Sequence, residues 1–253
     1  MLDRLTGRWT GIALSLLTVL GTLWLALTGN LDLYVHPRYY AFTIAMGVIG
    51  GLTSLAALLL LPSSERDEHD HAVDDIPVPA HRRVLSVVGR VLLVAIAAVV
   101  LLALPPTTLT SALAADRELN SAAATETSAT SPDLAETDGS TFSVKDWAGL
   151  LRQGLPADYF QGKTADVTGF VLDTGADDVF YLARFHITHC ALDAQPVGIP
   201  VHWPGWRQEL QTDEWLAVVG GFRSNPLASE DAPVVLMPSE SRPVNQPEDP
   251  YVY

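Results

Sequence analysis

Cysteine and basic residues are scarce in this chain of 253 residues, which has 1 Cys and 15 Lys and Arg against 29 Asp and Glu. Its single cysteine, Cys190, cannot form an internal disulfide or supply a multi-cysteine zinc finger. The net charge of −14 repels the phosphate backbone of a nucleic acid, so we expect no nucleic-acid partner. No Gly-x-Gly-x-x-Gly, phosphate-binding loop or serine elbow occurs, and the sequence therefore predicts no enzymatic activity.

Acidic and hydrophobic residues are distributed unevenly along the chain. Residues 1–115 carry 7 basic and 8 acidic residues, a net charge of −1, whereas residues 116–253 carry 8 and 21, a net charge of −13. Long apolar blocks occur only in the first of these parts. This division predicts a membrane part followed by an acidic, water-exposed part.

Three apolar blocks in the first half have the length of a membrane span, about 20 residues for about 30 Å of hydrocarbon. Residues 9–28 and 39–61 contain no charged side chain, and residues 84–106 contain only Arg90, near the start of the block. Trp9, Tyr39 and Tyr40 lie where an aromatic belt forms at the membrane surface. We predict three transmembrane helices in contact with the lipid bilayer.

Basic residues in the short loops predict the orientation of these helices. Five arginines precede the first span or lie between the second and third, whereas Arg38 alone lies between the first and second. The cytoplasmic side carries the excess of arginine and lysine, so the N-terminus and the loop 62–83 are expected there. An odd number of spans then places the C-terminal domain outside the cytoplasm. An alternative is signal-type cleavage after Ala114, which would release that domain.

The part after the third span changes from a linker to a β-rich domain. Residues 107–140 are rich in Ala, Ser, Thr and acids, which is typical of a tether. Ser143 is placed to cap a short helix that has Trp147, Leu150 and Leu151 on one face. Five strands are then expected, at residues 165–173, 179–188, 197–203, 215–222 and 234–237. They favour an OB-like small barrel, with a β-sandwich as the alternative.

The predicted fold class is therefore three membrane α-helices followed by an extracytoplasmic, mainly-β domain. The expected segments are a cytoplasmic N-terminal tail at 1–8, transmembrane helices at 9–28, 39–61 and 84–106, an outer loop at 29–38, a cytoplasmic acidic loop at 62–83, a linker at 107–140, the barrel domain at 141–243 and a tail at 244–253.

Reactive side chains are densest between residues 186 and 193. His186, His189, Cys190 and Asp193 offer two imidazoles, a thiolate and a carboxylate, the donor types of a tetrahedral zinc site. Strand alternation brings His189 to the face of His186 only if the chain turns between them. The alternative is that Cys190 packs as a small buried apolar residue and that backbone carbonyls bind the histidines.

Several separated motifs resemble the YcgQ-like family of bacterial membrane proteins. They occupy residues 34–38, 161–171, 183–201 and 214–220, together with Pro105-Pro106, Leu109, Ala115 and Arg117. The resemblance covers most of the chain. It implies an accessory subunit of a two-component permease, partnered by a separate polytopic membrane protein, with metal homeostasis as the context.

Many members of that family have two adjacent cysteines where this chain has His189 and Cys190. An imidazole in place of a thiol keeps a zinc-ligand type, whereas it removes a vicinal dithiol. The sequence thus predicts a multi-pass protein of the bacterial plasma membrane, an accessory permease subunit whose outer barrel binds zinc. The alternative is an extracytoplasmic protein-interaction module with no metal and no catalytic activity.

Overall fold

The computed structural model describes residues 2–60, 80–104, 106–121, 139–227 and 232–253. The chain divides into two compact units: one comprises Met1–Asp32 and Pro37–Thr107, and the other comprises Leu33–His36 and Thr108–Tyr253. Most of the predicted acidic loop 62–83 lies outside the described residues, as does the predicted linker from residue 122 to 138.

The first unit consists of three long helices, α1 (Leu2–Leu27), α2 (Tyr40–Leu60) and α3 (Ala80–Ala103). Each contains a stretch long and apolar enough to cross a membrane, at Trp9–Leu27, Pro37–Leu60 and Val84–Leu101. The three predicted membrane helices are therefore confirmed as long apolar helices. They are helical because a helix satisfies its backbone N–H and C=O groups internally, as an apolar segment in lipid requires.

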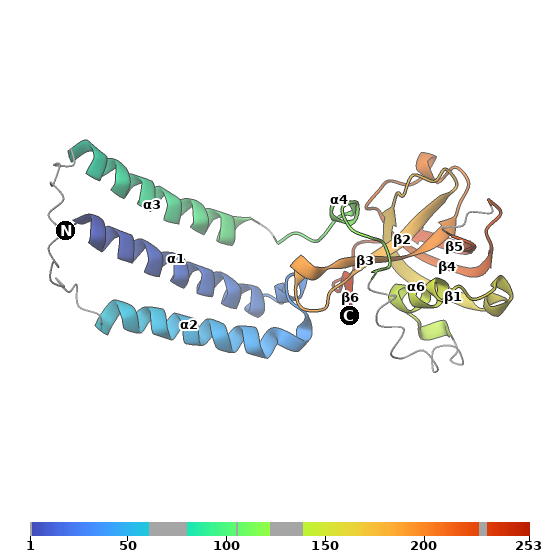
Figure 1. The fold of residues 1–253 in the computed structure, drawn as a ribbon, viewed down its shortest axis with the longest axis horizontal. Helices are drawn as coiled ribbons and strands as arrows, with labels where there is room; N and C mark the ends of the chain where they lie inside the picture. The colour runs from blue at the N-terminus through green and yellow to red at the C-terminus, as the bar shows by residue number, and fades with distance from the viewer. Residues whose placement is uncertain (1, 61–79, 105, 122–138, 228–231) are drawn as a thin grey trace. The chain divides into compact units, whose positions relative to one another are not determined.

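Helix α1 packs against both α2 and α3, whereas α2 and α3 share few contacts in the part of the chain that the structure describes (Figure 1). Small residues allow the close approach of α1 and α2. A Cβ atom added at Gly51 would lie 3.3 Å from Val19 of α1, and one added at Gly47 would lie 3.7 Å from Leu23. Gly47 and Gly51 of α2 therefore face α1 of the same chain.

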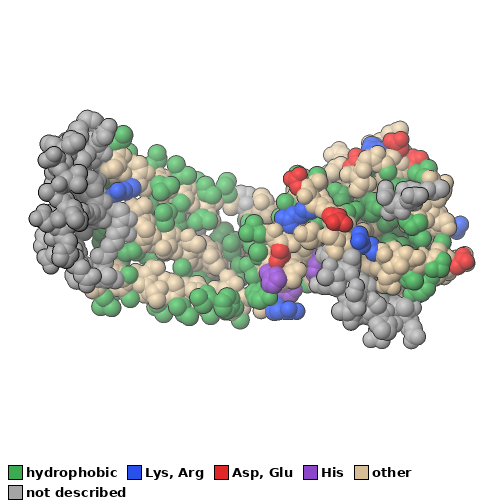
Figure 2. Space-filling model, in the orientation of Figure 1, with side chains coloured by type: hydrophobic (Ala, Val, Ile, Leu, Met, Phe, Trp, Pro, Cys, Tyr) green, Lys and Arg blue, Asp and Glu red, His purple; other side chains and the backbone are tan. Residues whose placement is uncertain are grey.

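Many large apolar side chains of the three helices are exposed, as on the face that Figure 2 shows. Phe42 and Leu52 of α2 and Val91 of α3 are all more than half exposed. In water such a surface would cost free energy in proportion to its apolar area, so it fits lipid or partner helices.

The second unit is built on a closed barrel of five strands. They are β1 (Thr164–Leu172), β2 (Val179–His186), β3 (Gln195–His202), β4 (Trp215–Ser224) and β5 (Val234–Pro243). Pairing runs β1-β2-β3-β5-β4 and back to β1, and only β3 and β5 are parallel within this ring. The predicted OB-like barrel is confirmed, and the alternative of an open sandwich is not what forms.

A short sixth strand, β6 (Tyr251–Val252), lies at the C-terminus, where the sequence indicated only a tail. It pairs in parallel with Phe185 and His186 of β2. The pairing of β1 with β2 ends at Ala183, so β6 occupies the part of that strand edge that β1 leaves open.

Helix α6 (Val144–Arg152) precedes the barrel and packs against β3. Ser143 and Asp146 form a capping box, in which the Ser143 Oγ accepts from the Asp146 N–H and the Asp146 carboxylate accepts from the Ser143 N–H. Trp147 and Leu150 on the predicted face are completely buried. The predicted cap and the predicted apolar face are therefore both confirmed.

Residues 108–121, which the composition assigned to the linker, lie on the barrel, and we call them the strap. Its helix α4 (Ser111–Ala114) buries Ala114, and Ser111 donates from its N–H and its hydroxyl to the carboxylate of Asp213 at 2.6 and 2.8 Å. Asn120, in the left-handed conformation at φ 64°, donates to the Gly198 carbonyl and accepts from the Gly198 N–H. Apolar packing adds to these hydrogen bonds, because Leu109, Leu113 and Leu119 of the strap pack against the buried cluster that contains Ala114.

The pairing of β4 with β5 changes register between Val219 and Gly220, where Ser239 of β5 is skipped. A Cβ added at Gly220 would lie 2.3 Å from the carbonyl oxygen of Met237, whereas one added at Gly221 would meet nothing closer than 3.8 Å. We predict that Gly220→Ala lowers the free energy of unfolding by about 2 kcal/mol or more because the strand backbones must move apart.

Gly221→Ala is the matched control, and its effect should stay below about 1 kcal/mol. Denaturant unfolding of the full chain in detergent, followed by tryptophan emission, measures both. Equal effects of the two substitutions would contradict the described packing at Gly220.

Candidate functional site

His186, the first of the four predicted ligands, ends β2 with its side chain only 3% exposed. Its Nδ1 lies 3.1 Å from the carbonyl oxygen of Val252 in β6. A carbonyl oxygen can only accept, so this nitrogen carries the proton in the contact. The imidazole therefore holds the C-terminal strand against the barrel.

Asp193 closes the turn that follows β2, residues 187–194, which we call the 187–194 loop. Its carboxylate accepts from the N–H groups of Thr188 at 3.2 Å, His189 at 2.9 Å and Cys190 at 3.3 Å. These N–H groups lie beyond the end of β2, where the sheet no longer supplies acceptors, so they need others. The chain therefore turns after β2, as a site that includes His189 requires.

The side chains of His189 and Asp193 are in direct contact. The His189 Nδ1 lies 2.9 Å from the Asp193 Oδ2, the imidazole is 64% exposed and the carboxylate is 33% exposed. A carboxylate on one ring nitrogen fixes the tautomer and leaves the other nitrogen, Nε2, as the acceptor. Histidines that bind metals are oriented by carboxylates in this way.

Cys190 is partly exposed and pairs with the segment Leu33–His36, which lies between α1 and α2 in the sequence. We call Leu33–His36 the inter-span segment. Val35 and Cys190 form an isolated antiparallel bridge. Two backbone hydrogen bonds flank the pair, from His36 N to His189 O at 3.0 Å and from Ala191 N to Tyr34 O at 2.9 Å. In such a pair the facing side chains approach closely.

Side chains of the inter-span segment also contact the barrel unit. Leu33 packs against the buried cluster that contains Phe170 and Phe185. The His36 ring lies edge-on to the ring of Tyr253, with 4.7 Å between the centroids. The inter-span segment is therefore part of the barrel unit in its packing as well as in its backbone pairing.

The strap binds the C-terminal end of the 187–194 loop. Arg117 donates to the carbonyl oxygens of Ala194 and, at 3.0 Å, of Leu192. The N–H of Asn120 donates to the carbonyl of Pro196 at 2.9 Å. The strap and the inter-span segment together hold the 187–194 loop in place.

Arg184 of β2 is a half-buried basic residue near this loop. Burial lowers the pKa of Arg184, and the charge of Asp249 opposes that effect. The guanidinium lies over the ring of Trp215, 5.4 Å from its centroid. An arginine stays protonated under these conditions, so it is a fixed positive charge beside an aromatic face.

Of the four predicted ligands, the structure joins His189 to Asp193, keeps Cys190 in the same loop and engages His186 with β6. Among the described residues, no group of three or more His, Cys, Asp or Glu side chains is arranged to hold a metal ion. A zinc site in this loop therefore remains a prediction.

Comparison with known families matches both parts of the sequence. A model of the DUF1980 N-terminal domain matches residues 10–120, and a model of the DUF1980 C-terminal domain matches residues 137–253. The chain carries both domains of the DUF1980 family. No curated protein and no solved structure matches it.

The boundary between the two DUF1980 domains differs from the boundary between the compact units. The inter-span segment and the strap up to Asn120 belong to the N-terminal domain, yet both bind the barrel of the C-terminal domain. Sequence reasoning missed these contacts, since the only local signal was that the motifs at 34–38 and around Arg117 resemble a known family. Two stretches of the N-terminal domain therefore belong to the folded unit that contains the barrel.

We predict that Asp193→Ala releases the 187–194 loop. Three N–H groups lose a charged acceptor, and such bonds contribute about 1.5–3 kcal/mol each. Amide exchange at Thr188, His189 and Cys190 should accelerate at least about tenfold, as measured by hydrogen–deuterium exchange on the full chain.

Asp173→Ala is the control, because it removes a carboxylate that binds Arg207 and the Gly175 N–H, and neither residue belongs to the strap or the inter-span segment. It should leave exchange in the 187–194 loop unchanged. Unaltered exchange in Asp193→Ala would show that this carboxylate does not organise the loop.

Proposed function

We propose that this DUF1980 chain is a membrane-anchored accessory subunit of a transport complex in the bacterial plasma membrane. Its three spans dock on a separate polytopic permease, and its barrel contacts that partner outside the cytoplasm. The resemblance to the YcgQ-like family supports this role, since those proteins are regarded as accessory subunits of a two-component permease. The proposal gives the chain no catalytic part.

The open arrangement of the three helices carries the proposal. Helix α1 packs against both neighbours, whereas α2 and α3 share few contacts within the described residues. Large apolar side chains of α2 and α3 remain exposed. Three helices arranged in this way enclose no pathway, but they offer apolar faces on which partner helices can pack.

The contacts within the barrel unit support a location of the inter-span segment and the strap on the same side of the bilayer. The inter-span segment lies between the first and second spans in the sequence, and the strap follows the third. If all three helices cross the bilayer, both stretches emerge on one side, as the pairing of Val35 with Cys190 requires. The arginine count of the short loops assigns that side to the exterior.

In its finer form, the proposal makes a transition metal the cargo, with zinc received at the 187–194 loop. His189 and Cys190 supply an imidazole and a thiolate, and Asp193 orients the imidazole through their 2.9 Å contact. His186 takes no part, because it is only 3% exposed and lies against β6. The competing function is an interaction module without metal, in which the barrel contacts the partner and the histidines are structural.

Affinity purification of the tagged full chain from its native membranes tests the proposal. A polytopic membrane protein should co-purify in mild detergent after cross-linking, and chelators should not release it. Leu52→Trp and Val91→Trp enlarge exposed side chains on α2 and α3, and at least one of them should reduce recovery about tenfold.

Gly21→Ala is the internal control, because that position is buried and an added Cβ would meet nothing closer than Leu101 at 3.9 Å, so recovery should be unchanged. Zinc measured on the same complex should be stoichiometric in the wild type and absent in His189→Ala. Metal-free complex with full partner recovery would retain the interaction module and reject the zinc cargo. Failure to recover any polytopic partner would reject the accessory-subunit role itself.

A further inference from the structure

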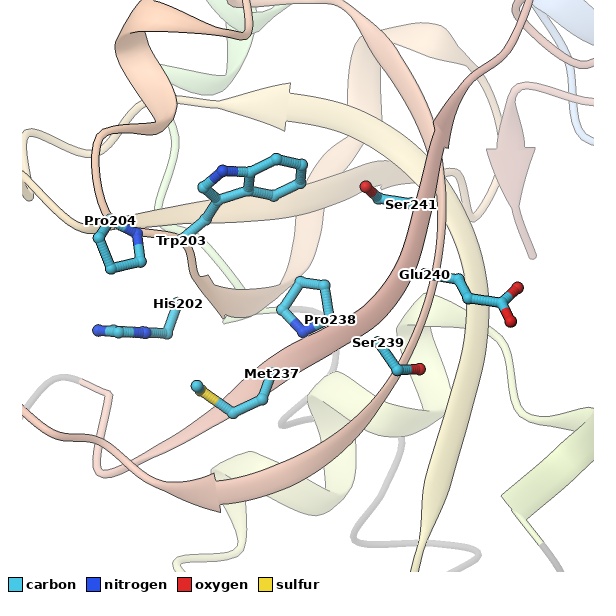
Figure 3. Close-up of a pocket in the computed structure, with 8 residues that line it drawn as sticks. All are labelled: His202, Trp203, Pro204, Met237, Pro238, Ser239, Glu240 and Ser241. Atoms are coloured by element: carbon cyan, nitrogen blue, oxygen red, sulfur yellow. The ribbon is translucent and has the colours of Figure 1, made fainter.

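A groove of about 380 Å³ opens on the barrel beside β3 and β5 (Figure 3). The two strands pair in parallel at Val201 and Leu236, whose side chains are completely buried. Side chains alternate along a strand, so the next residues, His202 and Met237, face away from the barrel interior. Both line the groove.

The imidazole of His202 has an unsatisfied polar atom. Its Nδ1 is buried and has no hydrogen-bond partner among the residues that the structure describes. Burying a polar nitrogen without a partner is unfavourable, because the nitrogen loses its hydrogen bonds with water. A bound species that accepts its lone pair would remove that cost.

The groove is lined by an imidazole and a thioether, and also by the hydroxyls of Ser239 and Ser241 and the carboxylate of Glu240. The thioether of Met237 is half-buried and reaches into the same end of the groove as His202, while Glu240 points away from both in Figure 3. A thioether with an imidazole selects a soft cation such as Cu(I), whereas carboxylates and water suit hard cations. Trp203 adds an aromatic face, which attracts a cation electrostatically.

We propose that the groove formed by His202, Trp203 and Met237 binds a soft monovalent cation, Cu(I) or Ag(I), through the His202 imidazole and the Met237 sulfur. This site is separate from the 187–194 loop. That loop precedes β3 and the groove lies at the end of β3, an eight-residue strand about 23 Å long. The proposal therefore stands whether or not the accessory-subunit role is correct.

Silver ion in chloride-free buffer is the probe, because it is stable in air and has the ligand preference of Cu(I). The purified full chain carries Cys190→Ser, which removes a thiolate that binds soft cations wherever it lies. Titration calorimetry should show one equivalent bound. Met237→Leu, which conserves side-chain volume, and His202→Ala should each weaken binding at least tenfold.

Two substitutions serve as matched controls in the same background. Met46→Leu replaces a methionine of α2, and His189→Ala replaces the imidazole of the other candidate site. Both should leave silver binding unchanged, excess zinc should not compete, and Trp203→Phe should reduce the quenching of tryptophan emission by silver.

The proposal is overturned if Cys190→Ser binds no silver, or if silver binding survives both Met237→Leu and His202→Ala. Equal weakening by Met46→Leu or His189→Ala would also overturn it. Thermal unfolding of each variant identifies a loss of fold. If His202→Ala unfolds, His202→Gln takes its place, and the same loss of binding is required of it.

Discussion

The pairing of the inter-span segment with the 187–194 loop is the contact on which the arrangement of this protein depends. Only a short stretch separates α1 from α2, yet its central residues form a β-bridge with Cys190. A chain that folds in this way cannot place its C-terminal barrel and its first inter-span connection on opposite sides of a membrane. One backbone pairing therefore links the number of spans to the location of the barrel.

Strand β3 connects the two candidate binding sites of the barrel unit. The 187–194 loop enters it at Gln195, and the groove of His202 lies at its other end. Between these ends, the buried side chains of Val197, Ile199 and Val201 contribute to the core. The closed barrel thus keeps the exposed His189–Asp193 pair and the groove of His202 at opposite ends of one strand, so that each can be tested without disturbing the other.

Local patterns in the sequence predict the parts of this fold that local physics forms. Apolar runs give the three long helices, short runs between turn residues give the five strands, and Ser143 gives the cap of α6. The strap, β6 and the inter-span pairing leave no such pattern, since they depend on single groups such as Asn120, Arg117 and Val35 that meet partners far along the chain. His186 shows the same limit: its sequence position suggests a ligand, and only the fold reveals Val252 as its partner. The groove likewise joins residues 202 and 237 through the parallel register of β3 and β5.

Disulfide formation between position 35 and Cys190 tests the central contact most directly. The flanking hydrogen bonds make Val35 and Cys190 a non-hydrogen-bonded pair with close side chains. Full-length Val35→Cys protein in membranes, treated with a mild oxidant, should form an intramolecular bond that a thiol-reactive mass tag detects as two protected cysteines. A Leu27→Cys variant, at the end of α1 and outside the paired segment, should not. Two reactive thiols in oxidised Val35→Cys protein would contradict the pairing and the common side that follows from it.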